Sequence, residues 1–139
     1  MQKPPASSDR PRAFAVTASE TPVEGYDDRQ SGNLTWRTLI CANRTPSAEI
    51  TVGVAIFPPR GTLNRHRHEP AEFYFGLTGS GTVTVEGERF AINPGIAIYI
   101  PGNSEHSIEA GSSGLTLLYG FARGDFDSIA YQFTHTIAS

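Results

Sequence analysis

Four side chains that can bind a metal ion fall in two segments of the sequence. His66 and His68 are two residues apart, Glu72 follows after a short bend, and His106 comes from a later segment. Side chains two apart in a β-strand point to the same face, so we expect His66 and His68 to share one. Three imidazoles and one carboxylate suit a divalent first-row ion and leave up to two coordination positions for substrate or water. The alternative is a chance cluster of surface histidines beside two arginines.

The elements that must position these side chains are short strands. After Asn33, runs rich in Val, Ile, Thr, Phe and Tyr alternate with turn formers, which is typical of an antiparallel all-β barrel or sandwich. Gly and Asn in the intervening segments supply the positive φ that tight turns require. The predicted strands are Leu34–Cys41, Glu49–Phe57, Glu72–Thr78, Gly81–Glu86, Glu88–Ile92, Ile96–Ile100, His106–Glu109, Leu115–Phe121 and Ser128–Phe133.

The N-terminal segment differs from the rest of the chain in composition and periodicity. Residues 1–31 contain four prolines with scattered Ser, Asp and Arg, and they show no sustained period of 2 or 3.6. We therefore predict a mobile N-terminal arm over 1–31 and a single β-barrel domain over 32–139. A chain of 139 residues is long enough to build one core without disulfides.

Composition excludes several function classes. The chain is 38% hydrophobic and 18% charged with a formal net charge of −3, so it has no basic field for nucleic acid. No apolar run approaches the ~20 residues that span a bilayer. The first twelve residues lack the apolar core of a secretory signal, so a cytoplasmic protein is the default expectation.

The residues around the four candidate ligands form a recognisable pattern. It reads Gly61, four residues, His66-Arg67-His68, three residues, Glu72, six residues, Gly79, and later Gly95, five residues, Pro101-Gly102, three residues, His106. This resembles the two motifs of the cupin superfamily, which supply two histidines and a glutamate from the first motif and one histidine from the second. The resemblance implies a cupin double-stranded β-helix, a small antiparallel jelly-roll barrel. Three positions differ from the usual cupin motifs: Gly61 lies one residue closer to His66, Gly102 follows its proline directly, and Ala110 stands where asparagine is common. All four ligand positions match the motifs.

Strand parity after Glu72 gives a second expectation. If Glu72 points inward, so does Tyr74, with Gly76 leaving space beside it. Phe73, Phe75 and Leu77 then point outward and are too apolar to face water, so a second layer must cover them. The N-terminal arm or a second subunit would do so, and we favour a homodimer.

A narrower resemblance concerns activity. The segments His66–Tyr74, Ile98–His106 and Phe126–Phe133 are similar to those of small single-domain cupins that include dimethylsulfoniopropionate lyases. The resemblance implies a lyase that splits dimethylsulfoniopropionate into acrylate and dimethyl sulfide, with Tyr74 or Tyr131 acting on the substrate. Removal of a proton α to a carboxylate requires a metal and a base, and an aromatic wall such as Tyr99 or Trp36 would receive the sulfonium by cation–π contact.

Other functions remain open at this point. The same ligands would serve an Fe(II) dioxygenase acting on a small organic acid, and a non-catalytic small-ligand or metal-binding cupin is a third interpretation. A sugar isomerase or epimerase is also compatible with the residues. The ligand set suits one divalent transition metal, with Fe(II) the first choice and Mn, Ni, Co or Zn alternatives, and the expected partner is a small carboxylate substrate.

Overall fold

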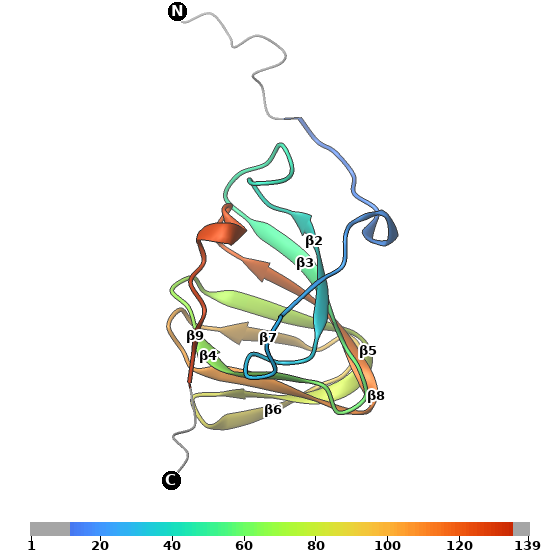
Figure 1. Ribbon diagram of the computed structural model, residues 1–139, viewed down its shortest axis with the longest axis vertical. Coiled ribbons are helices and arrows are strands. Elements are labelled where there is room, and N and C mark those ends of the chain that lie inside the picture. The colour runs from blue at the N-terminus through green and yellow to red at the C-terminus, as the bar shows by residue number, and fades with distance from the viewer. Residues whose placement is uncertain (1–11, 135–139) are drawn as a thin grey trace, which may run out of the picture.

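The computed structural model describes residues 12–134, and strands make up most of them. Two short 3-10 helices accompany the strands, and no α-helix occurs in this range. The elements are η2 (Ala18–Glu20), β1 (Glu24–Gly25), β2 (Thr35–Ile40), β3 (Thr51–Phe57), β4 (Thr62–Arg67), β5 (Glu72–Val85), β6 (Glu88–Ile92), β7 (Ala97–Ile100), β8 (His106–Phe121), η3 (Phe126–Ser128) and β9 (Gln132–Phe133) (Figure 1). The all-β prediction is therefore confirmed.

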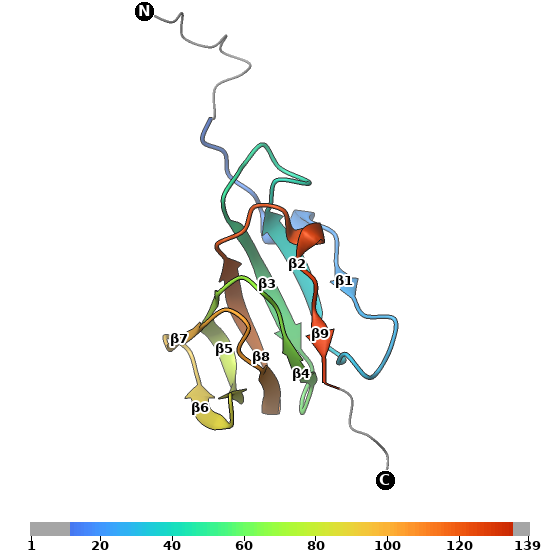
Figure 2. The ribbon, with the colours of Figure 1, turned by 90° about the vertical axis from the view of Figure 1, so that its left-hand side faces the viewer.

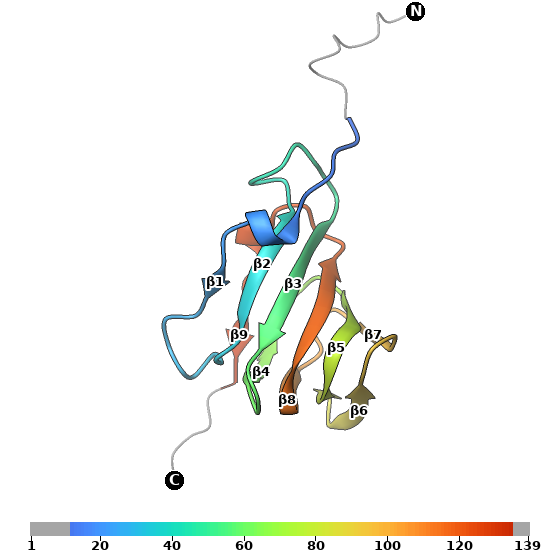
Figure 3. The same ribbon diagram turned by 90° about the vertical axis from the view of Figure 1, so that its right-hand side faces the viewer.

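All strands belong to one curled antiparallel sheet. Its main order is β1-β2-β3-β8-β4-β9, and β5 joins through β8 and carries β6 and β7. Figure 3 shows β2, β3, β8 and β5 side by side in one wall, with the fainter β4 and β9 behind it. The long β8 pairs with β3, β4 and β5, so it links the two sides of the barrel.

The interior is apolar because inward positions alternate along each strand. In β3 every second residue, from Thr51 to Phe57, is buried, and the residues between them are half-buried on the outer face. The same alternation holds at the start of β5, where Glu72, Tyr74 and Gly76 are buried while Phe73 and Leu77 are exposed. The predicted parity of this segment is thus confirmed.

Two predicted turns are bends within longer strands. The sequence predicted a break at Gly79–Gly81, but β5 runs continuously from Glu72 to Val85, with register shifts against β8 between Gly76 and Thr78 and between Gly79 and Gly81. Gly79 has a φ of 75°, which a bulge can use as readily as a turn. The predicted segments 106–109 and 115–121 are likewise joined in β8. Strand β4 was absent from the predicted strands.

The N-terminal segment contributes to the sheet. β1 pairs with β2, with Glu24 opposite Trp36, so the sheet begins before the predicted boundary at residue 32. The guanidinium of Arg37 donates to the carbonyl oxygens of Ala18 and Thr21, which holds η2 against β2. The mobility of residues 1–31 stays a prediction, and residues 1–11 lie outside the described range.

No helix within residues 12–134 is long and apolar enough to cross a membrane.

Candidate metal centre

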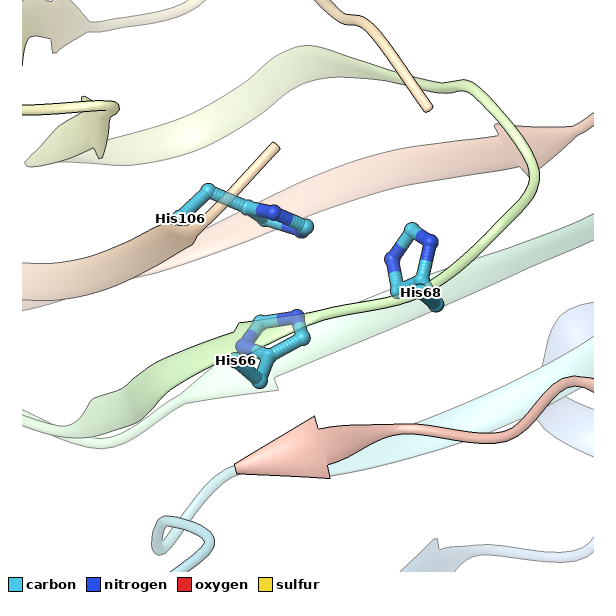
Figure 4. A group of neighbouring side chains, drawn as sticks. All are labelled: His66, His68 and His106. Carbon is cyan, nitrogen blue, oxygen red and sulfur yellow. The ribbon is translucent and has the colours of Figure 1, made fainter. Parts of the chain in front are cut away.

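The structure brings the predicted ligands together in the barrel interior. His66 lies on β4, His68 directly after it, Glu72 at the start of β5 and His106 at the start of β8. His66 and His106 are direct partners in the pairing of β4 with β8. All four side chains are buried, with His66 fully inaccessible. One ring nitrogen from each histidine lies within 4.8 Å of the others, and Figure 4 shows the three rings converging.

Backbone carbonyls decide which nitrogen of each histidine faces the centre. Nδ1 of His66 lies 2.7 Å from the Asn64 oxygen, Nδ1 of His68 2.9 Å from the Pro70 oxygen, and Nδ1 of His106 2.8 Å from the Ser104 oxygen. A carbonyl oxygen only accepts, so each Nδ1 carries the proton and donates it. A neutral ring then presents its unprotonated Nε2 inward. This arrangement orients the histidines in metal sites.

The nitrogen and oxygen atoms that face the centre form a buried cluster of lone pairs. Oε1 of Glu72 lies 3.2 Å from Nε2 of His68 and 3.2 Å from Nε2 of His106, while Nε2 of His66 has no hydrogen-bond partner among residues 12–134. Burial, together with nearby His106, lowers the pKa of His66 to about 3, so this ring is neutral at pH 7. Buried acceptors that face one another and a carboxylate need a cation to satisfy them. The donor set therefore fits a divalent metal ion.

A cavity of about 250 Å³ that opens to the surface lies beside this cluster, and Glu72 belongs to its wall. Aromatic rings form much of the remaining wall, namely those of Tyr26, Trp36, Phe57, Tyr74, Tyr119, Phe126 and Tyr131. Within residues 12–134, the charged side chains that line it are Glu72 and Asp127, and no Lys or Arg does so. Arg44 contacts Asp127 at 3.4 Å but is not part of the wall. Glu72 belongs to the histidine cluster, and Asp127 is exposed and pairs with Arg44, so the aromatic ring faces are the feature of the wall that attracts a cation.

Both tyrosines predicted from the sequence line this cavity. Tyr74 is 2% exposed, and its hydroxyl lies beside the Glu72 carboxylate without a well-formed hydrogen bond. Burial and the Glu72 charge raise its pKa. Tyr131 precedes β9, and its ring stacks on His66 with centroids 5.1 Å apart and 10° between planes. Burial and Glu72 also raise the pKa of Tyr131.

The aromatic residues predicted to contact a sulfonium do not all line the cavity. Trp36 lines the cavity, as predicted. Tyr99 does not, because it is 70% exposed on the outer face of β7, opposite Phe73. Tyr26 and Tyr119 were not predicted as site residues. The parity of Tyr119 with buried Phe121 was a usable signal, whereas Tyr26 lies in a segment without periodicity.

The fold and the buried histidine cluster together define a metal-binding cupin, and the cupin domain family matches residues 53–119. The chain belongs to the cupin family. It is 44% identical over 120 residues to a dimethylsulfoniopropionate lyase, DddW, from Ruegeria pomeroyi, and the match covers 86% of this chain and 79% of the relative. Both the family and the narrower resemblance inferred from the sequence are therefore confirmed.

Solved structures agree on the fold. The polyketide cyclase RemF from Streptomyces resistomycificus superposes with a TM-score of 0.73 at 19% identity, over 90% of this chain and 87% of that one. A predicted oxalate decarboxylase from Thermotoga maritima gives 0.69 at 23% identity, over 79% and 99%. A chain from a study of the dimethylsulfoniopropionate lyases RdDddP and RnDddQII gives 0.70 at 13% identity, over 83% and 63%. At these identities the likeness concerns the fold alone.

Proposed function

We propose that this chain is a metal-dependent carbon–sulfur lyase that cleaves dimethylsulfoniopropionate to acrylate and dimethyl sulfide. The observation that carries the proposal is the pairing of a buried histidine cluster with an aromatic cavity whose described wall residues include no Lys or Arg. The 44% identical relative, itself a lyase for this compound, supports the same substrate.

His66, His68, Glu72 and His106 are the proposed ligands of one divalent transition metal, with Fe(II) first and Mn, Ni, Co or Zn as alternatives. Their support is the convergence of three unprotonated Nε2 atoms and one carboxylate oxygen in a buried site. A bound divalent ion supplies a Lewis acid, which lowers the barrier to loss of a proton α to a carboxylate by several kcal/mol.

The cavity wall suits the substrate's two charges. Its described residues offer no Lys or Arg to hold a carboxylate, so the substrate carboxylate belongs at the metal centre. Glu72 contributes to both the centre and the cavity, so a ligand at the centre extends between the aromatic rings. A sulfonium at the other end of the substrate meets ring faces, which attract cations.

Tyr74 and Tyr131 are the candidate bases. Both line the cavity, and the Tyr74 hydroxyl is buried with no well-formed protein partner, so it is available to a ligand. The base must be a phenolate, which a divalent ion bound beside it would favour over the neutral hydroxyl. The phenolate takes the proton from the α-carbon, the C–H electrons form the new Cα=Cβ bond, and the Cβ–S electron pair leaves on sulfur. Acrylate and dimethyl sulfide are released, and the proton stays on the tyrosine until water removes it.

A headspace assay tests this proposal. Protein purified without oxygen and analysed for metal should release dimethyl sulfide from dimethylsulfoniopropionate both with and without oxygen. A preparation loaded with Fe(II), Mn(II) or Zn(II) that releases none would overturn the lyase. Substrate-dependent oxygen uptake in that preparation would instead support the Fe(II) dioxygenase that the ligand set also allows.

The homodimer is also part of the proposal, through the outer face of the sheet. Two rows of outward residues cross β3, β8, β5 and β7, namely Val52–Gly120–Phe73–Tyr99 and Val54–Leu118–Phe75–Ala97. Phe73 and Leu77 are each 40% exposed. Monomeric proteins seldom expose large apolar side chains in a contiguous patch. A second copy of the same face would bury these rows. The cytoplasmic location stays a prediction from the sequence.

A further inference from the structure

Tyr26 and Trp36 form an aromatic pair in the cavity wall. Their ring centroids lie 4.9 Å apart with 57° between planes, and both rings line the cavity. Tyr26 also meets Phe133 edge-on at 5.7 Å, and Phe133 lies 5.3 Å from the ring of His66. One chain of aromatic contacts thus connects the pair to the metal centre.

Contacts on both sides of Tyr26 hold its part of the backbone against the sheet. Glu24, two residues before it, is the strand partner of Trp36. The Glu24 carboxylate accepts hydrogen bonds from Thr38 at 2.8 Å and from Arg44 at 2.6 Å. After Tyr26, the Asp28 carboxylate accepts from the backbone N–H of Ser31 at 2.8 Å. Tyr26 is therefore a positioned wall residue even though it comes from the N-terminal segment.

The ring faces of this pair favour a cation. The faces of Tyr and Trp rings carry negative electrostatic potential. The charged side chains among the described wall residues are Glu72 and Asp127. Glu72 belongs to the metal centre, and Asp127 pairs with Arg44, which also pairs with Glu24, so the rings themselves are left to recognise a cation.

We infer that Tyr26 and Trp36 form the subsite that binds the onium group of the substrate, so that the N-terminal segment selects onium carboxylates over neutral branched acids of the same shape. This inference rests on the proposed function for the placement of the carboxylate. It assigns Tyr26 a role in specificity that the sequence did not indicate.

A matched pair of ligands tests the subsite without turnover. The probes are 3-(trimethylammonio)propionate and 4,4-dimethylpentanoate, which share a carboxylate and a branched end of similar shape and differ in the positive charge. Trp36 is the single tryptophan of the chain, so its fluorescence reports directly on the subsite. Titration of the zinc-loaded protein should give a dissociation constant about 5-fold to 30-fold lower for the ammonium compound.

Variants at Tyr26 show how far the ratio of the two dissociation constants depends on the Tyr26 ring. Tyr26→Phe keeps the ring and should keep the ratio, whereas Tyr26→Leu removes the ring and should reduce the ratio at least about threefold. Thermal unfolding checks that each variant folds, and Tyr26→Met replaces Tyr26→Leu if the latter does not. The same titrations by calorimetry on Trp36→Leu should show a similar reduction.

Two results would overturn the inference. One is equal affinity of the wild-type protein for both probes, and the other is an unchanged ratio in Tyr26→Leu and Tyr26→Met. These outcomes are separate from failure of the proposed function. A protein that prefers the ammonium probe but releases no dimethyl sulfide keeps the onium subsite and loses the lyase activity.

Discussion

Replacing Tyr74 by phenylalanine should separate activity from stability. The side chain is 2% exposed, and its hydroxyl is buried without a well-formed hydrogen bond. An unpaired buried polar group costs about 1–3 kcal/mol, so its removal should leave the metal-free protein as stable or about 1 kcal/mol more stable. Unfolding entropy scales with length at roughly 2.1 cal/mol/K per residue, so 1 kcal/mol corresponds to about 3 °C in Tm for a chain of 139 residues.

The same substitution should greatly reduce catalysis. A well-placed general base contributes about 10²–10⁴-fold. If Tyr74 is the base, Tyr74→Phe should lower anaerobic release of dimethyl sulfide at least about a hundredfold, which is about 2.7 kcal/mol of transition-state stabilisation. Tyr131→Phe should do so if Tyr131 is the base instead. Metal content should be unchanged in both variants, because neither hydroxyl is a proposed ligand.

The assay combines three measurements on each variant: headspace dimethyl sulfide, bound metal and thermal unfolding of metal-free protein. Tyr99→Phe is the matched control, since Tyr99 is 70% exposed on the outer face and should alter none of them. Full activity in both Tyr74→Phe and Tyr131→Phe would refute the assignment of a tyrosine base. A fall in Tm of several degrees for Tyr74→Phe would instead reveal a hydrogen bond that stabilises the folded protein.

Three further outcomes are expected. His106→Ala should remove most bound metal and activity, as should alanine at each other proposed ligand. The control His135→Ala, outside the described residues, should do neither. Full metal occupancy in His106→Ala would exclude this histidine as a ligand. Leu77→Glu should convert a dimer to a monomer by light scattering, with the exposed Val23→Glu as control, and a monomeric wild-type protein would contradict the interface. Deleting residues 1–12 should leave folded, metal-loaded protein, because this stretch is too polar to form part of a core, and loss of folding would show that it covers the outer face.

The sequence was most informative where local geometry and chemistry coincide. Residue types and spacing marked His66, His68, Glu72 and His106 as candidates, and the cupin resemblance implied that they meet. All four lie together in the barrel. Strand parity placed Tyr74 beside Glu72 on the inner face because side chains alternate along any strand.

The sequence predicted strand boundaries less well where a glycine can serve either a turn or a bulge. Gly79 was interpreted as part of a turn, and Gly114 fell between two predicted strands. Both have positive φ, yet each lies inside a long strand. A positive φ serves a bulge as well as a turn, and the pairing partner across the sheet decides which one forms. Tyr99 was a plausible aromatic wall by residue type, but its pairing with Phe73 places it outside the barrel.

By itself, the sequence determined the all-β class and the inward face of β5, because these depend on residue types and on the period of a strand. The cupin resemblance supplied the grouping of the four candidate ligands. The tertiary structure alone decided which nitrogen of each histidine faces the centre, since the orienting carbonyls of Asn64, Pro70 and Ser104 are set by the local backbone path. It also brought Tyr26 into the cavity wall. A two-residue strand has too few positions to show a period, and Tyr26 is placed by pairing with β2 and by contacts to distant side chains.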